Sequence, residues 1–250
     1  GVSLMSFGPS RGDKPPKPTT TTTTTTVPTT TTTTAPPTST TIFFDSDRVG
    51  HFEIYRTNDQ GTEAVRLTNS TQYDSWWPRL SPDRTRIAFH RTPVGIHDTD
   101  FTKVSLWVMN VDGSGLTQLR SAGTDGWAMQ GHVEWSPDGG SFVMFGGSNI
   151  FNPQIYITNT NGTNPYRVTA RPGTNIDPSW RPDGAAIVFV GCPQATCYPA
   201  DYEIYAIPTA GGTATRITTD WLRDHDPYFS PDGQSLAWLT QTSLAGAHAA

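Results

Sequence analysis

The chain of 250 residues contains little lysine, and this shortage limits the ligands that its surface can attract. Lys103 is the only lysine beyond residue 41. The first 41 residues carry a net charge of +2 and the whole chain carries −5, so the remainder carries −7. Nucleic acids and anionic membranes bind clustered basic side chains. We therefore expect neither as a partner, and an acidic body favours cationic groups, sugars or divalent cations.

Catalytic motifs are also absent from the printed sequence. It contains no GxSxG nucleophile elbow, no HExxH helix and no phosphate-binding loop. No apolar period of 3.6 residues lasts beyond a turn or two, which excludes a helical fold. We predict no enzymatic activity unless a catalytic domain lies beyond residue 250, no cofactor and no metal. The clusters "HDTD" (97–100) and "DHD" (224–226) leave a calcium site as an alternative, although no full calcium-loop motif accompanies them. A second alternative stays open, because His90, His132 and His225 could converge as a metal-dependent sugar lyase requires.

Cysteine occurs only twice, as Cys192 and Cys197 in "GCPQATCYP". Two sulfurs do not complete a metal site, and no histidine stands close by. The pair can bridge a short loop in an oxidising compartment, or remain as two free thiols in a reducing one. We predict the disulfide, because the N-terminal segment described below is typical of exported proteins.

A repeated phrase is the main positive feature of the chain. It reads "PRLSPDRTRIAF" (78–89), "VEWSPDGGSFVMF" (133–145), "PSWRPDGAAIVF" (178–189) and "PYFSPDGQSLAW" (227–238). Two further phrases, of the "EIY" type (53–61, 106–113, 154–162 and 203–211) and the "RLT" type (65–68, 116–120, 166–169 and 215–218), lie before and between these copies and always keep the same order. Each phrase is rich in β-branched and aromatic residues, and Asp-Gly or Asn-Gly turns separate them. One copy therefore predicts four antiparallel strands, and the repeat predicts stacked propeller blades.

These lines, together with "FDSDRVGHFEIYRTNDQGTEAVRLT", resemble the TolB-type, WD-like β-propeller repeat over residues 42–240. The resemblance implies an all-β fold of four-stranded blades in a ring of six, a periplasmic or secreted location, and binding to other proteins. Similar propellers also precede the catalytic domain of prolyl-oligopeptidase-like peptidases, and others form oligogalacturonate lyases.

The strand count predicts an incomplete ring. Residues 42–69 supply three strands, residues 76–120, 132–169 and 178–218 supply four each, and residues 227–239 supply two. We expect about four to five blades within residues 42–240, forming an open arc of a six-bladed ring, followed by a tail at 241–250.

The N-terminal region has a different composition. Residues 15–41 are almost entirely Thr and Pro, which predicts a disordered linker or stalk of the kind found in exported proteins. Residues 1–14 precede it as a short stub, and its apolar start is either the remnant of a signal peptide or membrane anchor, or an artefact. We expect an exported protein, with a membrane or cell-wall tether through a missing N-terminal segment.

Long loops gather on one rim of such a propeller and carry the candidate binding residues. The loops are 91–103, 121–131, 191–202 and 219–226. We predict a non-catalytic scaffold that binds a protein or a carbohydrate through this rim, and a propeller of a larger hydrolase or a polysaccharide lyase is the alternative. The candidate residues are Trp76, Trp77, His97, Asp98, Asp100, Trp127, His132, Trp221, Asp224 and His225. The tryptophans can serve as anchors or sugar platforms, or can pack between blades.

Overall fold

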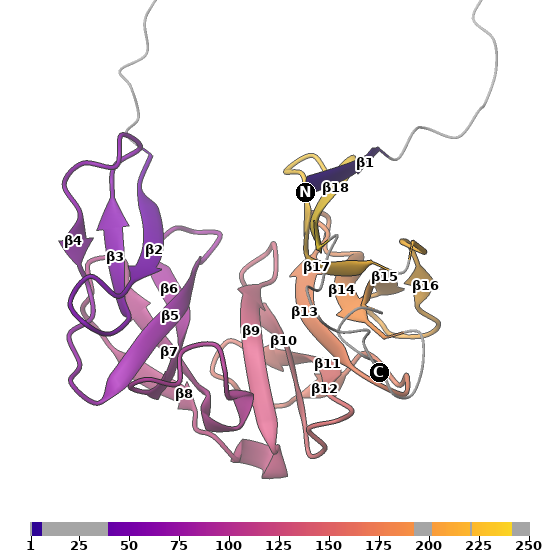
Figure 1. Ribbon diagram of the computed structural model, residues 1–250, viewed down its shortest axis with the longest axis horizontal. Coiled ribbons are helices and arrows are strands. Elements are labelled where there is room, and N and C mark those ends of the chain that lie inside the picture. The colour runs from indigo at the N-terminus through magenta and orange to yellow at the C-terminus, as the bar shows by residue number, and fades with distance from the viewer. Residues whose placement is uncertain (1, 7–39, 193–201, 221, 242–250) are drawn as a thin grey trace, which may run out of the picture.

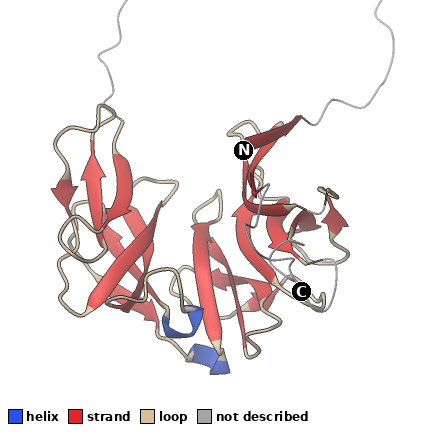
Figure 2. Cartoon of the chain, viewed as in Figure 1, coloured by secondary structure: helices blue, strands red, loops and turns tan. Residues whose placement is uncertain are grey.

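The computed structural model describes residues 2–6, 40–192, 202–220 and 222–241. Strands dominate this part of the chain (Figure 2), which contains only two single-turn 3-10 helices, η1 (Phe101–Lys103) and η2 (Thr124–Gly126). Neither of these helices has the length and apolar character that crossing a membrane requires.

The strands form five antiparallel sheets in chain order (Figure 1). The first contains β2 (Ile42–Ser46), β3 (Glu53–Thr57) and β4 (Val65–Arg66). The second contains β5 (Tyr73–Leu80), β6 (Arg86–Pro93), β7 (Ser105–Asn110) and β8 (Thr117–Arg120). The third contains β9 (Met129–Trp135), β10 (Ser141–Gly147), β11 (Gln154–Asn159) and β12 (Tyr166–Arg167). The fourth contains β13 (Asn175–Trp180), β14 (Ala186–Gly191), β15 (Glu203–Pro208) and β16 (Thr215–Arg216). The fifth contains β17 (Arg223–Phe229), β18 (Ser235–Gln241) and β1 (Val2–Ser6).

Each interior sheet buries both of its faces, as β10 illustrates. Its side chains alternate, so Phe142 and Met144 pack with residues of the second sheet, while Val143 and Phe145 pack with residues of the fourth. All four side chains are at most 1% exposed. Burial of one such side chain stabilises the fold by roughly 1.5–3 kcal/mol. A single sheet lacks this stabilisation, so neighbouring sheets depend on one another.

The sheets follow an arc, with the first strand of each full sheet innermost. The inner strands β5, β9, β13 and β17 contact one another in series. The first and last sheets face each other across the open side of the arc (Figure 1). Residues of β2 and β18 line a cleft of about 550 Å³ there. In the described part of the chain, β2 is an edge strand that pairs only with β3. The structure thus confirms an all-β propeller arc and accommodates the expected number of blades.

Two details differ from the sequence prediction. Inner strands begin several residues before the predicted starts at 76, 132, 178 and 227, because each continues through a bulge. The backbone of Val2–Ser6 forms β1 and pairs antiparallel with β18, from Val2 opposite Leu239 to Ser6 opposite Ser235. It occupies the third position of the last sheet, where an "EIY" strand stands in the full sheets. The predicted linker at 15–41 lies almost wholly outside the described residues, so the domain boundaries stay predictions.

Candidate functional site

The candidate site is formed by one repeated irregularity of the inner strands. Each inner strand has a register shift, and one residue at that shift has a positive φ. The four residues stand five positions before the repeated proline: Trp77 (φ 58°), His132 (48°), Asp177 (49°) and Asp226 (51°). A non-glycine residue seldom adopts this conformation, and such residues gather at functional sites. The bulges re-aim these side chains toward the centre of the arc.

All four residues line one cavity of about 480 Å³, which we call the central funnel. Loop residues complete its wall, including Asp98 after β6 and Ile150 and Pro153 between β10 and β11. Its lining is mixed, since apolar side chains such as Phe145 alternate with carboxylates and histidines. A cavity with a few convergent polar groups is the usual form of a binding site.

His132 is the centre of the polar network in the funnel. Its ring stacks on Trp77 with centroids 4.3 Å apart and an interplanar angle of 9°. Its Nδ1 hydrogen-bonds Asp177, and its Nε2 lies 3.5 Å from Asp98 Oδ1. Burial disfavours the charged ring, but attraction to Asp177 and Asp98 outweighs it and raises the pKa of His132 to about 9. The funnel therefore holds an imidazolium between two carboxylates at neutral pH.

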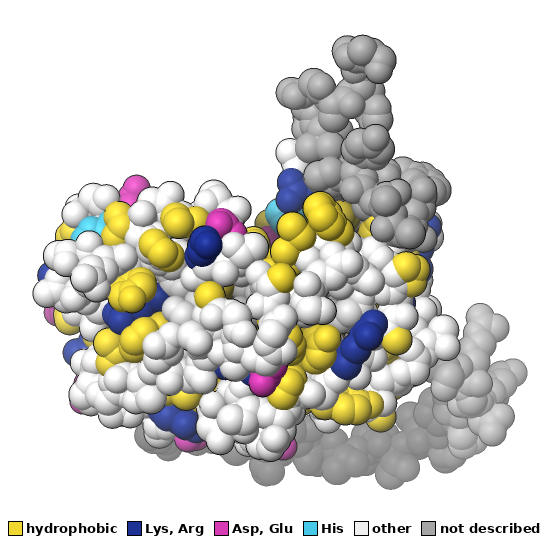
Figure 3. Space-filling model, turned by 90° about the horizontal axis from the view of Figure 1, so that it is seen from below, with side chains coloured by type: hydrophobic (Ala, Val, Ile, Leu, Met, Phe, Trp, Pro, Cys, Tyr) yellow, Lys and Arg dark blue, Asp and Glu magenta, His cyan; other side chains and the backbone are white. Residues whose placement is uncertain are grey.

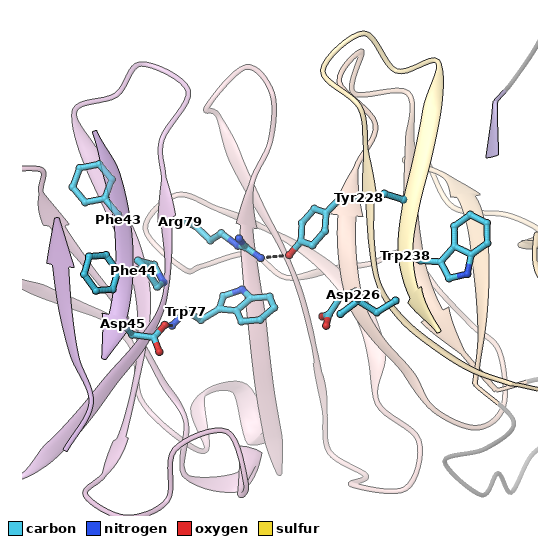
Figure 4. Close-up of a pocket in the computed structure, with 11 residues that line it drawn as sticks. Phe43, Phe44, Asp45, Trp77, Arg79, Asp226, Tyr228 and Trp238 are labelled. Atoms are coloured by element: carbon cyan, nitrogen blue, oxygen red, sulfur yellow. Dashed lines mark hydrogen bonds between the residues drawn. The ribbon is translucent and has the colours of Figure 1, made fainter. Parts of the chain in front are cut away.

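A second layer of side chains lies two residues further along the inner strands, where the strand period returns to the same face. Arg79 donates a hydrogen bond to the Tyr228 hydroxyl and thereby joins β5 to β17 (Figure 4). Its guanidinium also lies 4.3 Å from the centre of the Trp77 ring. Burial raises the pKa of Glu134 in the same layer, although Arg79 opposes the shift. These contacts form the wall between the funnel and the cleft, and both cavities share Trp77 and Asp226.

The structure places four of the predicted binding residues together in the funnel: Trp77, Asp98, His132 and His225. Of these, His225 donates a hydrogen bond from its Nδ1 to Asp226 Oδ2 at 2.9 Å. His97 lies nearby but stacks on Phe52 at 3.6 Å and contributes to packing between the first two sheets.

Trp76, Trp127 and Asp224 require correction as rim contacts, because all three are buried, whereas the binding role of Asp100 stays a prediction. Two further predictions lie partly or wholly outside the described residues. Trp76 and Trp127 are buried, because they fill space between sheets, so neither is available as a rim contact. Asp100 caps η1 by accepting from the Thr102 amide at 2.9 Å. Trp221 lies outside the described residues, and so does Cys197, so the disulfide with Cys192 stays a prediction.

Sequence reasoning missed Asp177, Asp226 and Ile150. Asp177 hydrogen-bonds His132, and Asp226 hydrogen-bonds His225. The constant spacing of five residues to Pro82, Pro137, Pro182 and Pro231 was the signal that could have found them. Asp74 accepts hydrogen bonds from two backbone amides, from Phe52 at 2.9 Å and Gly95 at 2.7 Å.

Exposed apolar side chains are sparse around the funnel. Phe151 is 79% exposed and follows Ile150, which is 45% exposed and lines the cavity. On the face drawn in Figure 3, apolar and charged side chains are interspersed and form no continuous apolar patch. Ile150 and Phe151 are therefore exposed apolar side chains beside the funnel that a partner could contact.

Comparison with known proteins gives three informative similarities, while no protein-family model matches the chain. A TolB homolog of Chlorobium luteolum is 32% identical over 154 residues, which are 60% of this chain and 31% of that protein. An uncharacterized peptidase of Bacillus subtilis, YuxL, is 23% identical over 223 residues, 76% of this chain and 32% of that protein. The structure of a putative TolB from Agrobacterium tumefaciens has a TM-score of 0.65 at 20% identity, covering 81% of this chain and 71% of that one. The chain spans about a third of the length of these curated relatives.

Proposed function

Since the chain is a TolB-like β-propeller, we propose that it is a non-catalytic scaffold that binds a protein partner at the mouth of the central funnel. The partner inserts a side chain with several hydrogen-bond donors, such as an arginine or a lysine, between the carboxylates of the funnel. An apolar residue of the partner packs on Phe151 beside the mouth. The protein acts in an exported compartment, where the predicted disulfide is stable.

The alignment of four strained positions around one cavity is the observation that supports this proposal. A packing role alone does not need positive φ at equivalent residues of four strands, because regular strands bury their side chains equally well. Asp98 has a side chain 46% exposed, so a ligand can reach a carboxylate that already contacts the His132 ring. Charge-assisted hydrogen bonds to such a carboxylate are short and strong.

Site-specific crosslinking tests the proposal. A photoreactive residue replaces Phe151 beside the funnel in one variant and Asp183, in the β13–β14 turn on the opposite rim, in another. Illumination in an envelope extract of the source organism should give a discrete protein adduct with the Phe151 variant alone. Asp98→Ala added to the Phe151 variant should reduce that adduct at least tenfold, because it removes the accessible carboxylate.

Two outcomes would contradict the proposal. Equal adducts from both rims would indicate nonspecific contact, and a Phe151 adduct unaffected by Asp98→Ala would separate the binding surface from the funnel. A carbohydrate ligand is the second class to be tested, with oligosaccharides as competitors of the adduct. Trp76 and Trp127 are buried and cannot stack on a sugar. Among the predicted rim tryptophans that the structure describes, Trp77 is therefore the remaining candidate for this role.

The similarity to YuxL supports an alternative, in which the chain is the propeller of a larger peptidase. That similarity extends over more of this chain than the similarity to the TolB homolog does. The complete reading frame distinguishes the two functions, since a peptidase of the prolyl-oligopeptidase type requires a downstream GxSxG nucleophile elbow. If the complete reading frame encodes such an elbow, the scaffold proposal is wrong and the chain is the propeller of a peptidase.

A further inference from the structure

A cluster of carboxylates lies outside the funnel, in the last connection between full sheets. Glu203 begins β15, Asp224 is the second residue of β17, and Asp220 lies in the loop that joins β16 to β17. One carboxylate oxygen from each of the three lies within 4.8 Å of the others. Glu203 and Asp224 are buried, whereas Asp220 is exposed and opens the cluster to water.

Asp224 has an unusual environment for a buried acid. Its Oδ1 accepts from the Thr240 hydroxyl at 2.7 Å. Its Oδ2 is buried and has no hydrogen-bond partner among the described residues. A buried carboxylate oxygen without a partner is costly, and a bound ion or water is one way in which such an atom is satisfied.

Asp224 differs from the residues at the equivalent position of the other blades in carrying a carboxyl group. Seven residues before the repeated prolines stand Ser75, Gln130, Asn175 and Asp224. The first three are neutral, and an arginine donates to the side-chain oxygen of each at 3.0 Å: Arg91 to Ser75, Arg120 to Gln130 and Arg171 to Asn175. In the last blade the neutral residue is replaced by Asp224, and within the described part of the chain no arginine donates a hydrogen bond to its side chain.

One guanidinium beside the cluster is already engaged in hydrogen bonds. Arg216 donates to Glu203 Oε1 and, through Nε, to the Thr218 carbonyl at 2.8 Å. The cluster thus places three carboxylates together, and Arg216 donates to one of them, Glu203. Burial raises the pKa of Asp224. Hydrogen bonds from the Thr218 and Thr240 hydroxyls oppose this shift, and the charges of Asp220 and Glu203 add to it.

We propose that Asp224, Glu203 and Asp220 bind one calcium ion, which takes the place that arginine holds in the other blades. The donors are oxygens alone, which suits a hard cation rather than zinc, which favours nitrogen and sulfur. Water on the side of Asp220 completes the six to eight ligands that calcium accepts at irregular geometry, whereas magnesium demands a stricter octahedron. The ion fastens the β16–β17 loop to the start of β15 and is independent of funnel binding.

Calorimetric titration and thermal unfolding of the full chain test this site. After treatment with EDTA, calcium chloride should bind at one ion per chain and raise the Tm by about 5 °C when in large excess over its Kd. Magnesium at the same concentration should raise the Tm much less. Asp224→Asn and Asp220→Ala should each abolish the calcium response, while Asp59→Asn, an exposed carboxylate in the first sheet, should retain it.

The variants also separate calcium binding from a structural role. In EDTA, Asp224→Asn should unfold at or above the temperature of the unaltered protein, because it keeps an oxygen for Thr240 and removes a buried charge. Absence of a calcium-dependent rise in the unaltered protein would overturn the proposal. A rise that persists in Asp220→Ala, whose exposed site tolerates truncation, would overturn it as well.

Discussion

His132 shows how a single residue can hold charge inside the funnel. Its side chain is 10% exposed, and burial alone would favour the neutral ring. Asp177 on one ring nitrogen and Asp98 near the other reverse that preference. The neighbouring His90 has no carboxylate partner among the described residues, and burial lowers its pKa well below the ordinary value. Of these two buried histidines of adjacent blades, His132 is therefore charged near pH 7 and His90 is neutral.

The His132 ion pair makes stability depend on pH in a defined direction. Because the folded pKa of about 9 exceeds the unfolded value of 6.5, the contribution is complete below pH 6.5 and is lost as the pH rises through 9. His132→Asn, which tolerates the positive φ, should lower the free energy of unfolding by roughly 3 kcal/mol at pH 6 and by much less at pH 9.5. Urea unfolding at both pH values measures the difference.

An NMR titration of the His132 ring provides the independent check. A midpoint at or below 6.5 in the folded protein, or a stability loss in His132→Asn that is equal at both pH values, would contradict the charged state.

Sequence alone selected three residues that the structure places in the funnel, because residue type and loop position suffice to select Asp98, His132 and His225. It did not separate Trp77, which lines the funnel, from Trp76, which is buried beside it. Adjacent residues of a regular strand face opposite sides, and the bulge changes which residue faces the centre. A one-residue shift of this kind leaves no mark in composition.

At the scale of elements, the turn between the first two strands of each blade carries its own stabilising pattern. In three blades a serine hydroxyl donates to the aspartate two residues later at 2.6 Å, at Ser81, Ser136 and Ser230. The same hydroxyl accepts from a backbone amide at the start of the next strand at 2.9 Å. The fourth blade replaces this serine with Arg181, which forms an exposed ion pair with Asp183.

This replacement supplies a matched pair of variants. Ser136→Ala removes two hydrogen bonds at a buried residue and should lower the free energy of unfolding by about 1–2 kcal/mol. Arg181→Ala at the equivalent position should change it by less than about 0.5 kcal/mol, because an exposed ion pair contributes little. Denaturant unfolding compares them, and equal losses would show that the hydroxyl is not the stabilising group.

Most strands were predictable, because Asp-Gly turns and alternating apolar residues mark them clearly. β1 was not, since its partner β18 lies more than 200 residues away and a short apolar segment has no local signal for a strand. The bulges escaped prediction for a related reason, because strand-length patterns do not specify where an extra residue enters the ladder.

For the whole molecule, the pairing of β1 with β18 ties the start of the chain to its last blade. Deletion of residues 1–6 should leave β18 with a free edge, and its amides should exchange with solvent at least tenfold faster. Amides of β14, in the middle of the fourth sheet, should be unaffected and serve as the internal control. Unchanged protection of β18 in the deleted protein would show that β1 does not pair there in solution.

The four positive-φ positions have a consequence for how such a protein can diversify. At these sites the backbone, rather than the side chain, determines direction, and Trp, His and Asp all occupy them in one chain. Exchanges among His, Asp and Asn there should alter the chemistry presented to a ligand while the surrounding ladders persist. Gene duplication followed by substitution at four codons would thus suffice to produce propellers with distinct selectivities on a common framework.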